Sequence, residues 1–263
     1  MVLRYCKDGD LRKYLNQSDT KNYELKIDKL LYIARRLLDI HNAGKVHKDF
    51  HSGNILFGNG VYISDLGMCQ PANNEAKKEG IYGVLPYMAP EVLRGCQYTK
   101  AADIYSFGIV MNEFMSEETP YNNIPHDHIL AVKICKGLRP EISEDTPKLL
   151  ADLITKCLDA KSDNRPTAKE LYEILYEWYS YIYYKSGEIY SQVEECEKIR
   201  ENKLKNKSNE DKSKNFQTHP QAIYSSRLLN FKNLPEPVNS SELLVNSLNS
   251  LDLSSYFSGI ILI

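Results

Sequence analysis

The sequence lacks any apolar run long enough to cross a bilayer, for which about 18 residues are needed. Its last five residues, Gly259–Ile263, are apolar but far too few to span. Charged residues follow the short apolar start of the chain at once, so the first residues do not resemble a secretory signal peptide. We therefore expect a cytoplasmic protein with no membrane partner.

Paired cysteines and an excess of charge are also missing. None of the six cysteines forms a Cys-x-x-Cys pair, and no histidine spacing suggests a zinc site, so reduced thiols are expected. The formal net charge is −2, which gives no reason to expect nucleic acid as a partner. A hydrophobic share of 42% is typical of a globular protein with a core.

Two short motifs carry the most information about function. Residues 47–54 read His-Lys-Asp-Phe-His-Ser-Gly-Asn, and residues 64–67 read Ser-Asp-Leu-Gly. They resemble the catalytic loop and the metal-binding loop of a eukaryotic protein kinase, and the style of the first is most similar to the tyrosine-kinase-like group of serine/threonine type. The resemblance implies ATP and Mg²⁺ as cofactors and a protein as the substrate.

Three later motifs extend this resemblance over about residues 1–180. They are Ala89–Glu91, which matches the end of a kinase activation segment, Asp103–Gly108, which matches the start of the central helix, and Asn164–Thr167, which matches the turn before the last helix. The fold class that follows is mainly α: the large, C-terminal lobe of a protein kinase, with a few short β-strands around the catalytic loop and a disordered tail.

The same resemblance assigns architectural roles. Asp103 should accept hydrogen bonds from the backbone of the catalytic loop. Glu91 should form an ion pair with Arg165 that ties the activation segment to the helical body. His47 should pack against Leu66, the residue after the metal-binding aspartate.

Three residues would carry out phosphoryl transfer in such a kinase. Asp49 would orient the substrate hydroxyl or accept its proton, Asn54 would be the amide ligand of one Mg²⁺ ion, and Asp65 would be its carboxylate ligand. Asp49 or Asp65 alone would most often be an exposed loop carboxylate. The complete set at this spacing favours the functional interpretation.

The resemblance also implies a nucleotide site near the start of the chain. The backbone of residues 4–6, including Cys6, would meet the adenine edge, with Leu3 beside the back pocket. Asp10 would approach the ribose, and Leu56 would form the floor under the adenine. The alternatives are a helix N-cap for Asp10 and an ordinary core position for Leu56.

Departures from the family pattern affect the acceptor preference. His51 stands where serine/threonine kinases usually place a catalytic lysine, and Val84 stands where they usually place a threonine. Because those two groups normally bond to each other and to the catalytic aspartate, the choice between serine/threonine and tyrosine stays open. Lys48 replaces an arginine and cannot form a two-pronged phosphate clamp.

Hydrophobic periodicity predicts helices over residues 28–43, 99–115 and 149–158, and a further helix that opens with a capping box at Thr167. The helix over 99–115 should be the most buried. Short strands are expected over residues 1–6 and 61–63, and residues 68–88 lack periodicity and indicate a functional loop.

Composition divides the chain into three parts. Residues 1–185 should form the hinge and C-terminal lobe of the kinase domain. Residues 186–215 should be a charged linker, with a frayed helix as an alternative over 195–215. Residues 216–263 should be a disordered tail that could hold a short motif for signalling partners.

The sequence contains no Gly-x-Gly-x-x-Gly loop and no Val-Ala-Ile-Lys strand, which a complete kinase places before its catalytic loop. Two interpretations follow. The chain is part of a protein kinase whose upstream lobe is missing from this sequence, and is inactive as given. Alternatively, it is a catalytically inactive half-kinase that acts as a protein-binding or scaffold module.

Overall fold

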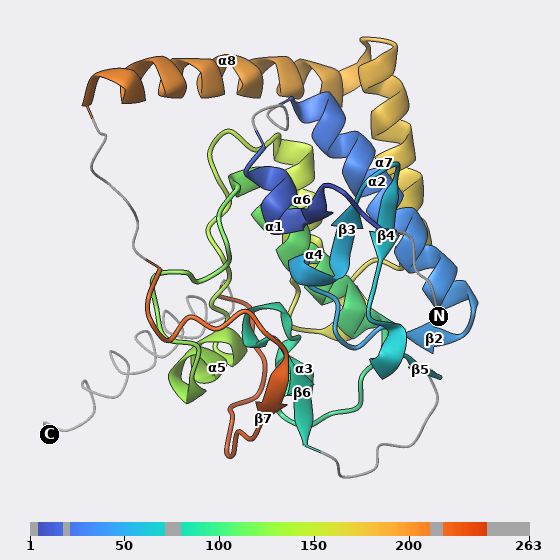
Figure 1. Cartoon of the computed structure of the whole chain (residues 1–263), viewed down its shortest axis with the longest axis vertical. Coiled ribbons are helices and arrows are strands. Elements are labelled where there is room, and N and C mark those ends of the chain that lie inside the picture. The colour runs from blue at the N-terminus through green and yellow to red at the C-terminus, as the bar shows by residue number, and fades with distance from the viewer. Residues whose placement is uncertain (1–4, 18–21, 72–79, 211–217, 241–263) are drawn as a thin grey trace, which may run out of the picture.

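The computed structural model describes residues 5–17, 22–71, 80–210 and 218–240. They form a mainly helical body with three small antiparallel sheets (Figure 1). This is the predicted fold class, a kinase large lobe with short strands around the catalytic loop. Among these residues, no helix is both long and apolar enough to cross a membrane.

Helix α4 (Lys100–Ser116) lies at the centre of the core. Its residues Ala102–Met115 are all buried, which confirms the buried helix predicted over 99–115. A Cβ atom on Gly108 would come within 2.8 Å of the Cys157 Cβ. Glycine is therefore needed here, because α4 approaches helix α6 (Lys148–Cys157) too closely for a side chain.

Two longer helices pack against each other beside this core. Helix α2 (Tyr23–Asn42) lies along helix α7 (Ala168–Tyr183). The predicted capping box opens α7, since Thr167 Oγ1 accepts from the Glu170 amide at 3.2 Å and the Glu170 carboxylate accepts from the Thr167 amide at 2.7 Å. The predicted face of α2 is buried: Leu30, Ile33, Ala34, Leu37 and His41.

The remaining elements of the lobe are short. Among the α-helices of the described residues, the short ones are α1 (Leu11–Leu15), α3 (Pro90–Leu93) and α5 (His128–Cys135). The first sheet has the order β1 (Gly9–Asp10), β3 (Ile55–Phe57) and β4 (Val61–Ile63), the second pairs β2 (Lys45–Val46) with β5 (Gln70–Pro71), and the third pairs β6 (Ile81–Gly83) with β7 (Arg227–Leu229).

The strands hold the ends of the two predicted functional loops. Strand β2 ends directly before His47, β3 begins directly after Asn54, and β4 leads into Ser64 and Asp65. The strand predicted over residues 1–6 differs from the structure. Tyr5 and Cys6 are not in a strand, a turn follows them, and β1 forms only at Gly9–Asp10; residues 1–4 lie outside the described residues.

Helix α8 (Gly187–Glu210) occupies most of the predicted linker. Its residues Ile189, Val193 and Cys196 are buried, because they follow one another at helical spacing and face the core. Arg200 adds an ion pair with Glu117 at the end of α4. The charged linker predicted over 186–215 therefore differs from the structure over residues 187–210, whereas the alternative of a helix over 195–215 agrees with it as far as residue 210. Residues 211–215 lie outside the described residues.

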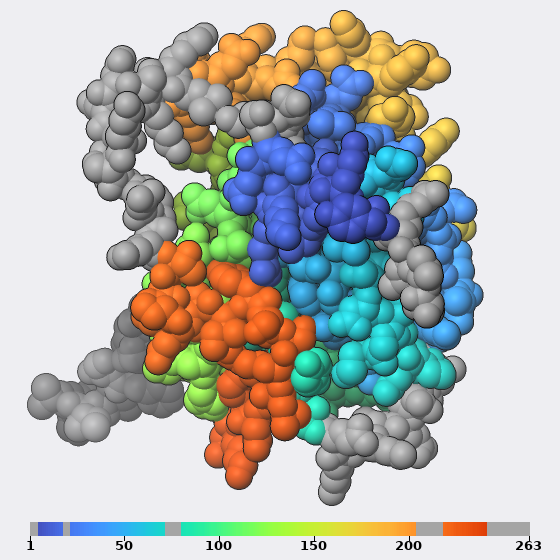
Figure 2. All heavy atoms as spheres, in the orientation of Figure 1, coloured from blue at the N-terminus to red at the C-terminus, as the bar shows by residue number. Residues whose placement is uncertain are grey.

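Residues 218–240, predicted to be part of a disordered tail, lie against the lobe. Strand β7 pairs with β6, and Leu229 is buried with 6% exposure. Figure 2 shows this segment, in orange-red, spread over the face of the molecule that also carries the N-terminal residues in dark blue. The prediction of a disordered tail is therefore wrong for residues 218–240. Residues 241–263 lie outside the described residues.

Candidate active site

Asp103, near the start of α4, sets the shape of the catalytic loop. Its buried carboxylate accepts hydrogen bonds from the amides of His47 (2.8 Å) and Lys48 (3.0 Å), and its Oδ2 lies 2.9 Å from His41 Nε2. Lys48 adopts a left-handed backbone with φ 72°, which lets two consecutive amides meet one carboxylate. The predicted role of Asp103 is confirmed.

Asp49 and Asn54 are held together inside this loop. The Asn54 side-chain nitrogen donates to the Asp49 carbonyl oxygen at 2.9 Å and lies 3.5 Å from Asp49 Oδ2. Both side chains are buried. The nitrogen of the amide is thus occupied, which leaves the Asn54 side-chain oxygen as its atom for a ligand. Asp49 Oδ1 is buried and has no hydrogen-bond partner among the described residues.

His51 presents a donor to Asp49. Its Nδ1 accepts a hydrogen bond from the Gly53 amide at 3.1 Å, so the proton of the neutral ring lies on Nε2. Nε2 lies 3.6 Å from Asp49 Oδ2. The structure therefore brings Asp49, His51 and Asn54 together within one loop.

The surroundings of Asp49 keep its carboxylate ionised. Burial by itself would raise the pKa of Asp49, but the nearby His51 ring, the hydrogen bond from Ser226 and the positive charge of the neighbouring histidines outweigh it, so the pKa lies below its ordinary value. An ionised carboxylate can accept a hydrogen bond from a hydroxyl and orient it. Its low basicity suits it less to early removal of the proton.

Asp65 is joined to the catalytic loop through its neighbour Ser64. The Ser64 amide and hydroxyl both donate to the Asn54 carbonyl oxygen, at 2.8 and 3.1 Å, and the Ser64 carbonyl oxygen lies 3.0 Å from His47 Nε2. Asp65 has a left-handed backbone with φ 55°. The His47 ring, expected to pack against Leu66, bonds the Ser64 carbonyl oxygen and meets Phe50 edge to face at 5.7 Å, while Leu66 is 54% exposed.

Asn54 and Asp65 fit a magnesium ion chemically. They offer an amide oxygen and an exposed carboxylate, the hard ligands that Mg²⁺ prefers. No cluster of three or more acidic, histidine or cysteine side chains suited to a metal occurs in the described part of the chain. An ion held by these two residues would therefore take its remaining ligands from water and from substrate phosphates, as is common for Mg²⁺.

The predicted nucleotide residues meet at one small sheet. Asp10 pairs with Leu56 across strands β1 and β3, and Leu56 is half-buried. Cys6 is half-buried, and its Cα lies 3.4 Å from where a Cβ would stand on Gly58. Asp10 is the N-cap of α1, accepting from the Lys13 amide at 2.9 Å, as the alternative interpretation expected. Leu3 lies outside the described residues.

The activation segment is anchored as predicted. Arg165 donates to both carboxylate oxygens of Glu91, at 2.7 and 2.8 Å, and also to the carbonyl oxygens of Ala101 and Asp159. Its side chain is buried, so the ion pair is largely shielded from solvent. The pair fixes the end of the segment against the helical body.

A buried polar network underlies the catalytic loop. Tyr87 donates to Glu113 at 2.7 Å, the Tyr87 and Ser52 hydroxyls lie 2.9 Å apart, and Arg12 donates to Ser52 at 3.0 Å. Burial, opposed by these contacts, raises the pKa of Glu113 to about 7. The network connects the nucleotide side of the lobe with the activation segment.

Ser226 touches Asp49 and His51, although no motif in the sequence marks it as a site residue. The Ser226 hydroxyl donates to Asp49 Oδ2 at 2.6 Å and lies 3.3 Å from His51 Nε2. Apolar residues such as Ile223, Tyr224, Leu228 and Leu229 indicate that this stretch can pack against the lobe, but they do not indicate that Ser226 meets Asp49.

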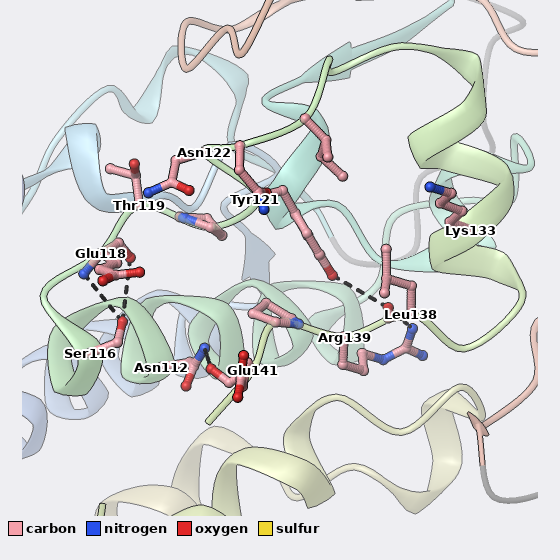
Figure 3. A pocket seen from close by; sticks show the side chains of 14 residues that line it. Asn112, Ser116, Glu118, Thr119, Tyr121, Asn122, Lys133, Leu138, Arg139 and Glu141 are labelled. Atoms are coloured by element: carbon pink, nitrogen blue, oxygen red, sulfur yellow. Dashed lines mark hydrogen bonds between the residues drawn. The ribbon is translucent and has the colours of Figure 1, made fainter. Parts of the chain in front are cut away.

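A pocket of about 460 Å³ lies apart from this set, beside the end of α4 (Figure 3). Asn112 donates to the Glu141 carbonyl oxygen at 3.1 Å, and Tyr121 donates to the Leu138 carbonyl oxygen at 3.3 Å, so both side chains are already engaged in the fold. None of the described site residues lines the pocket. We therefore place the candidate active site at the catalytic loop.

Comparison with known proteins agrees with this geometry. Residues 1–175 match the family model described as protein tyrosine and serine/threonine kinase. The chain is 34% identical over 180 residues to serine/threonine-protein kinase pakC of Dictyostelium discoideum, covering 65% of this chain and 37% of that protein. It is 31% identical over 170 residues to mitogen-activated protein kinase kinase kinase dlk-1 of Caenorhabditis briggsae, covering 64% and 20%.

A third relative is a protein kinase and PP2C-like domain-containing protein of Arabidopsis thaliana, 30% identical over 174 residues, with 52% of this chain and 26% of that protein covered. The chain belongs to the protein tyrosine and serine/threonine kinase family. It spans well under half the length of these three relatives.

Proposed function

We propose that this lobe serves a cytoplasmic protein kinase that transfers the γ-phosphate of ATP to serine or threonine hydroxyls of a protein. The observation that carries the proposal is the buried pair of Asp49 and Asn54, connected through Ser64 to Asp65. This arrangement supplies an ionised acceptor for a hydroxyl and two oxygen ligands for a cation on adjacent loops.

Each residue then has a distinct task. Asp49 accepts a hydrogen bond from the acceptor hydroxyl and orients its oxygen, and His51 donates toward the same carboxylate in the place of the usual lysine. Asn54 and Asp65 hold Mg²⁺, whose charge neutralises the phosphates when it is bound. Leu3, Cys6, Asp10 and Leu56 contact the nucleotide.

The 263 residues alone should transfer no phosphate measurably above background. Their sequence contains no Gly-x-Gly-x-x-Gly loop to cover the phosphates and no upstream lysine to pair with them. Accurate positioning of the reacting groups contributes roughly 7–11 kcal/mol to lowering such a barrier. Without these parts, Asp49 has a substrate hydroxyl to orient but no phosphate held in line with it.

A labelled-ATP assay with Mg²⁺ and a generic protein substrate tests both statements. The chain is compared with Asp49→Asn and with a fusion that carries an upstream kinase lobe. The fusion should gain activity that Asp49→Asn abolishes. Activity of the unfused chain that Asp49→Asn removes would contradict the inactivity proposal, and a fusion that stays inactive would contradict the kinase proposal.

The alternative function is a protein-binding module without catalysis. The contacts of residues 218–240 with the lobe support it, because an extended segment of the same chain pairs with β6 and reaches Asp49. A module of this kind would keep its binding partners when Asp49 is replaced by Asn, whereas the kinase, assayed as the fusion with an upstream lobe, would lose its activity. Pull-down and activity measured on the same variant separate the two functions.

A further inference from the structure

We propose that residues 223–229 bind in the groove that receives the acceptor segment of a protein substrate, with Ser226 in the position of the acceptor hydroxyl. The inference rests on the proposed kinase function and adds its substrate class: an extended strand with a serine or threonine, followed here by arginine. It also implies that this segment has to leave before another acceptor can enter.

The first support is the placement of the serine. Ser226 Oγ donates to Asp49 Oδ2 at 2.6 Å, and His51 Nε2 is 3.3 Å away. A substrate hydroxyl has to make the same contact with Asp49 for its oxygen to be oriented. No other serine or threonine hydroxyl is recorded in contact with the Asp49 carboxylate within the described ranges.

The second support is the backbone of the segment. Strand β7 pairs antiparallel with β6, with Gly83 opposite Arg227 and Ile81 opposite Leu229 (Figure 1). Tyr82 donates from its hydroxyl to the Ser226 carbonyl oxygen at 3.2 Å. Here β7 is the one strand that β6 pairs with among the described residues. Strand pairing is a general way to bind an extended peptide, because main-chain bonds hold it while alternate side chains select it.

Side chains before the serine find specific partners. Tyr224 donates to the Pro120 carbonyl oxygen at 3.0 Å, its ring meets His126 edge to face at 4.8 Å, and Arg12 lies 4.8 Å above it. His126 also bonds the backbone of Ile223. These contacts fix the direction of the chain as it enters the groove.

Side chains after the serine give the groove its selectivity. Arg227 donates to the His126 carbonyl oxygen at 2.6 Å, and Leu229 packs into the core with 6% exposure. Leu228, between them, is 67% exposed. The alternation is that of a strand with one bound face and one free face.

The geometry also decides between acceptor classes. With β7 paired to β6, the short side chain of Ser226 already reaches Asp49. Threonine carries its hydroxyl at the same atom, whereas tyrosine carries it beyond a ring, far past the carboxylate. The groove therefore takes serine or threonine in this register and excludes tyrosine.

Leu229→Asp provides the test, because it should release the segment by placing a charge in the core position. Leu228→Asp is the matched control, since it puts the same charge on the exposed neighbour. A fluorescent peptide with the sequence of residues 221–232 is titrated with each full chain and with wild type, and binding is followed by anisotropy. We expect at least tenfold tighter binding to Leu229→Asp than to wild type or Leu228→Asp.

Equal binding to all three chains would overturn the proposal. If Leu229→Asp does not fold, Arg227→Glu gives the same comparison from a position outside the core. A peptide with threonine at the serine position should retain the affinity, and one with tyrosine should lose at least tenfold; equal affinity would overturn the acceptor class. No ATP is needed, so failure of the kinase activity assay leaves this result independent.

Discussion

Glu91 and Arg165 lie 74 positions apart and form a two-pronged ion pair with distances of 2.7 and 2.8 Å. Glu91→Gln should lower the free energy of unfolding by roughly 2–4 kcal/mol, because the buried guanidinium would lose its counter-charge. Urea unfolding followed by circular dichroism measures the change. Glu173→Gln is the control, since its pair with Lys169 is exposed and its loss should cost less than about 0.5 kcal/mol. Similar losses in both variants would contradict the prediction.

Asp103→Asn should disturb the catalytic loop. The new amide side chain would offer a single oxygen where the carboxylate now uses both to accept from His47 and Lys48, so its NH₂ group would face a backbone N–H group. We expect a loss of about 2–3 kcal/mol in unfolding free energy and faster hydrogen exchange at residues 47–49. Asp152→Asn, in an exposed pair with Lys148, should change neither quantity. Unchanged exchange in Asp103→Asn would show that the loop holds its shape without this acceptor.

Glu113 predicts a pH dependence of stability. Burial raises its pKa in the folded protein to about 7, above the ordinary value of 4.5, so the fold prefers the protonated form. Below pH 4.5, Glu113 is protonated in both states and does not lower the free energy of unfolding. From pH 4.5 to about 7 the loss of stability grows, because the unfolded state ionises first, and above that pH the loss is constant. At about 1.4 kcal/mol per pH unit, the full cost is about 3 kcal/mol.

Glu113→Gln removes this titration while keeping the shape of the side chain. The difference in unfolding free energy between variant and wild type should therefore shift in favour of the variant by about 3 kcal/mol between about pH 4.5 and pH 8. Thermal or urea unfolding at several pH values across this range is sufficient. A difference that stays constant would mean that the pKa of Glu113 is the same in the folded and the unfolded protein.

Ser226→Asp should release residues 223–229 from the lobe by charge repulsion alone. The new carboxylate would stand beside Asp49, whose surroundings keep it ionised, and like charges repel at this distance. We expect faster hydrogen exchange at residues 81–83 and tighter binding of the peptide of residues 221–232. Ser225→Asp, at the exposed neighbouring position, is the control. Slow exchange at 81–83 in Ser226→Asp would show that the strand pairing does not depend on the serine.

The parts of the site that lie close together in the sequence were predictable. Asp49 and Asn54 share one short loop, so their spacing almost determines that they meet, and residues Ala102–Met115 signal a buried helix by composition alone. The pair of Glu91 and Arg165 could be predicted only through the family resemblance, because no local pattern connects positions so far apart.

The C-terminal segments were harder to predict because tertiary contacts decide their structure. In α8, the three buried residues Ile189, Val193 and Cys196 stand among many charged ones, and their contribution depends on a surface that only the folded lobe provides. Ser226 meets Asp49 across 177 positions. Its contact depends on the pairing of β7 with β6, which the local sequence of the tail does not reveal.

The pairing of β7 with β6 has a consequence for competition because both strands belong to one chain. A tethered occupant meets its groove at an effective concentration on the order of millimolar, which dilution of the protein does not lower. A free acceptor of equal intrinsic affinity would need a comparable concentration to compete. Cleavage of the chain between residues 210 and 218 would convert this occupant into an ordinary diffusible ligand, and only then would dilution empty the groove.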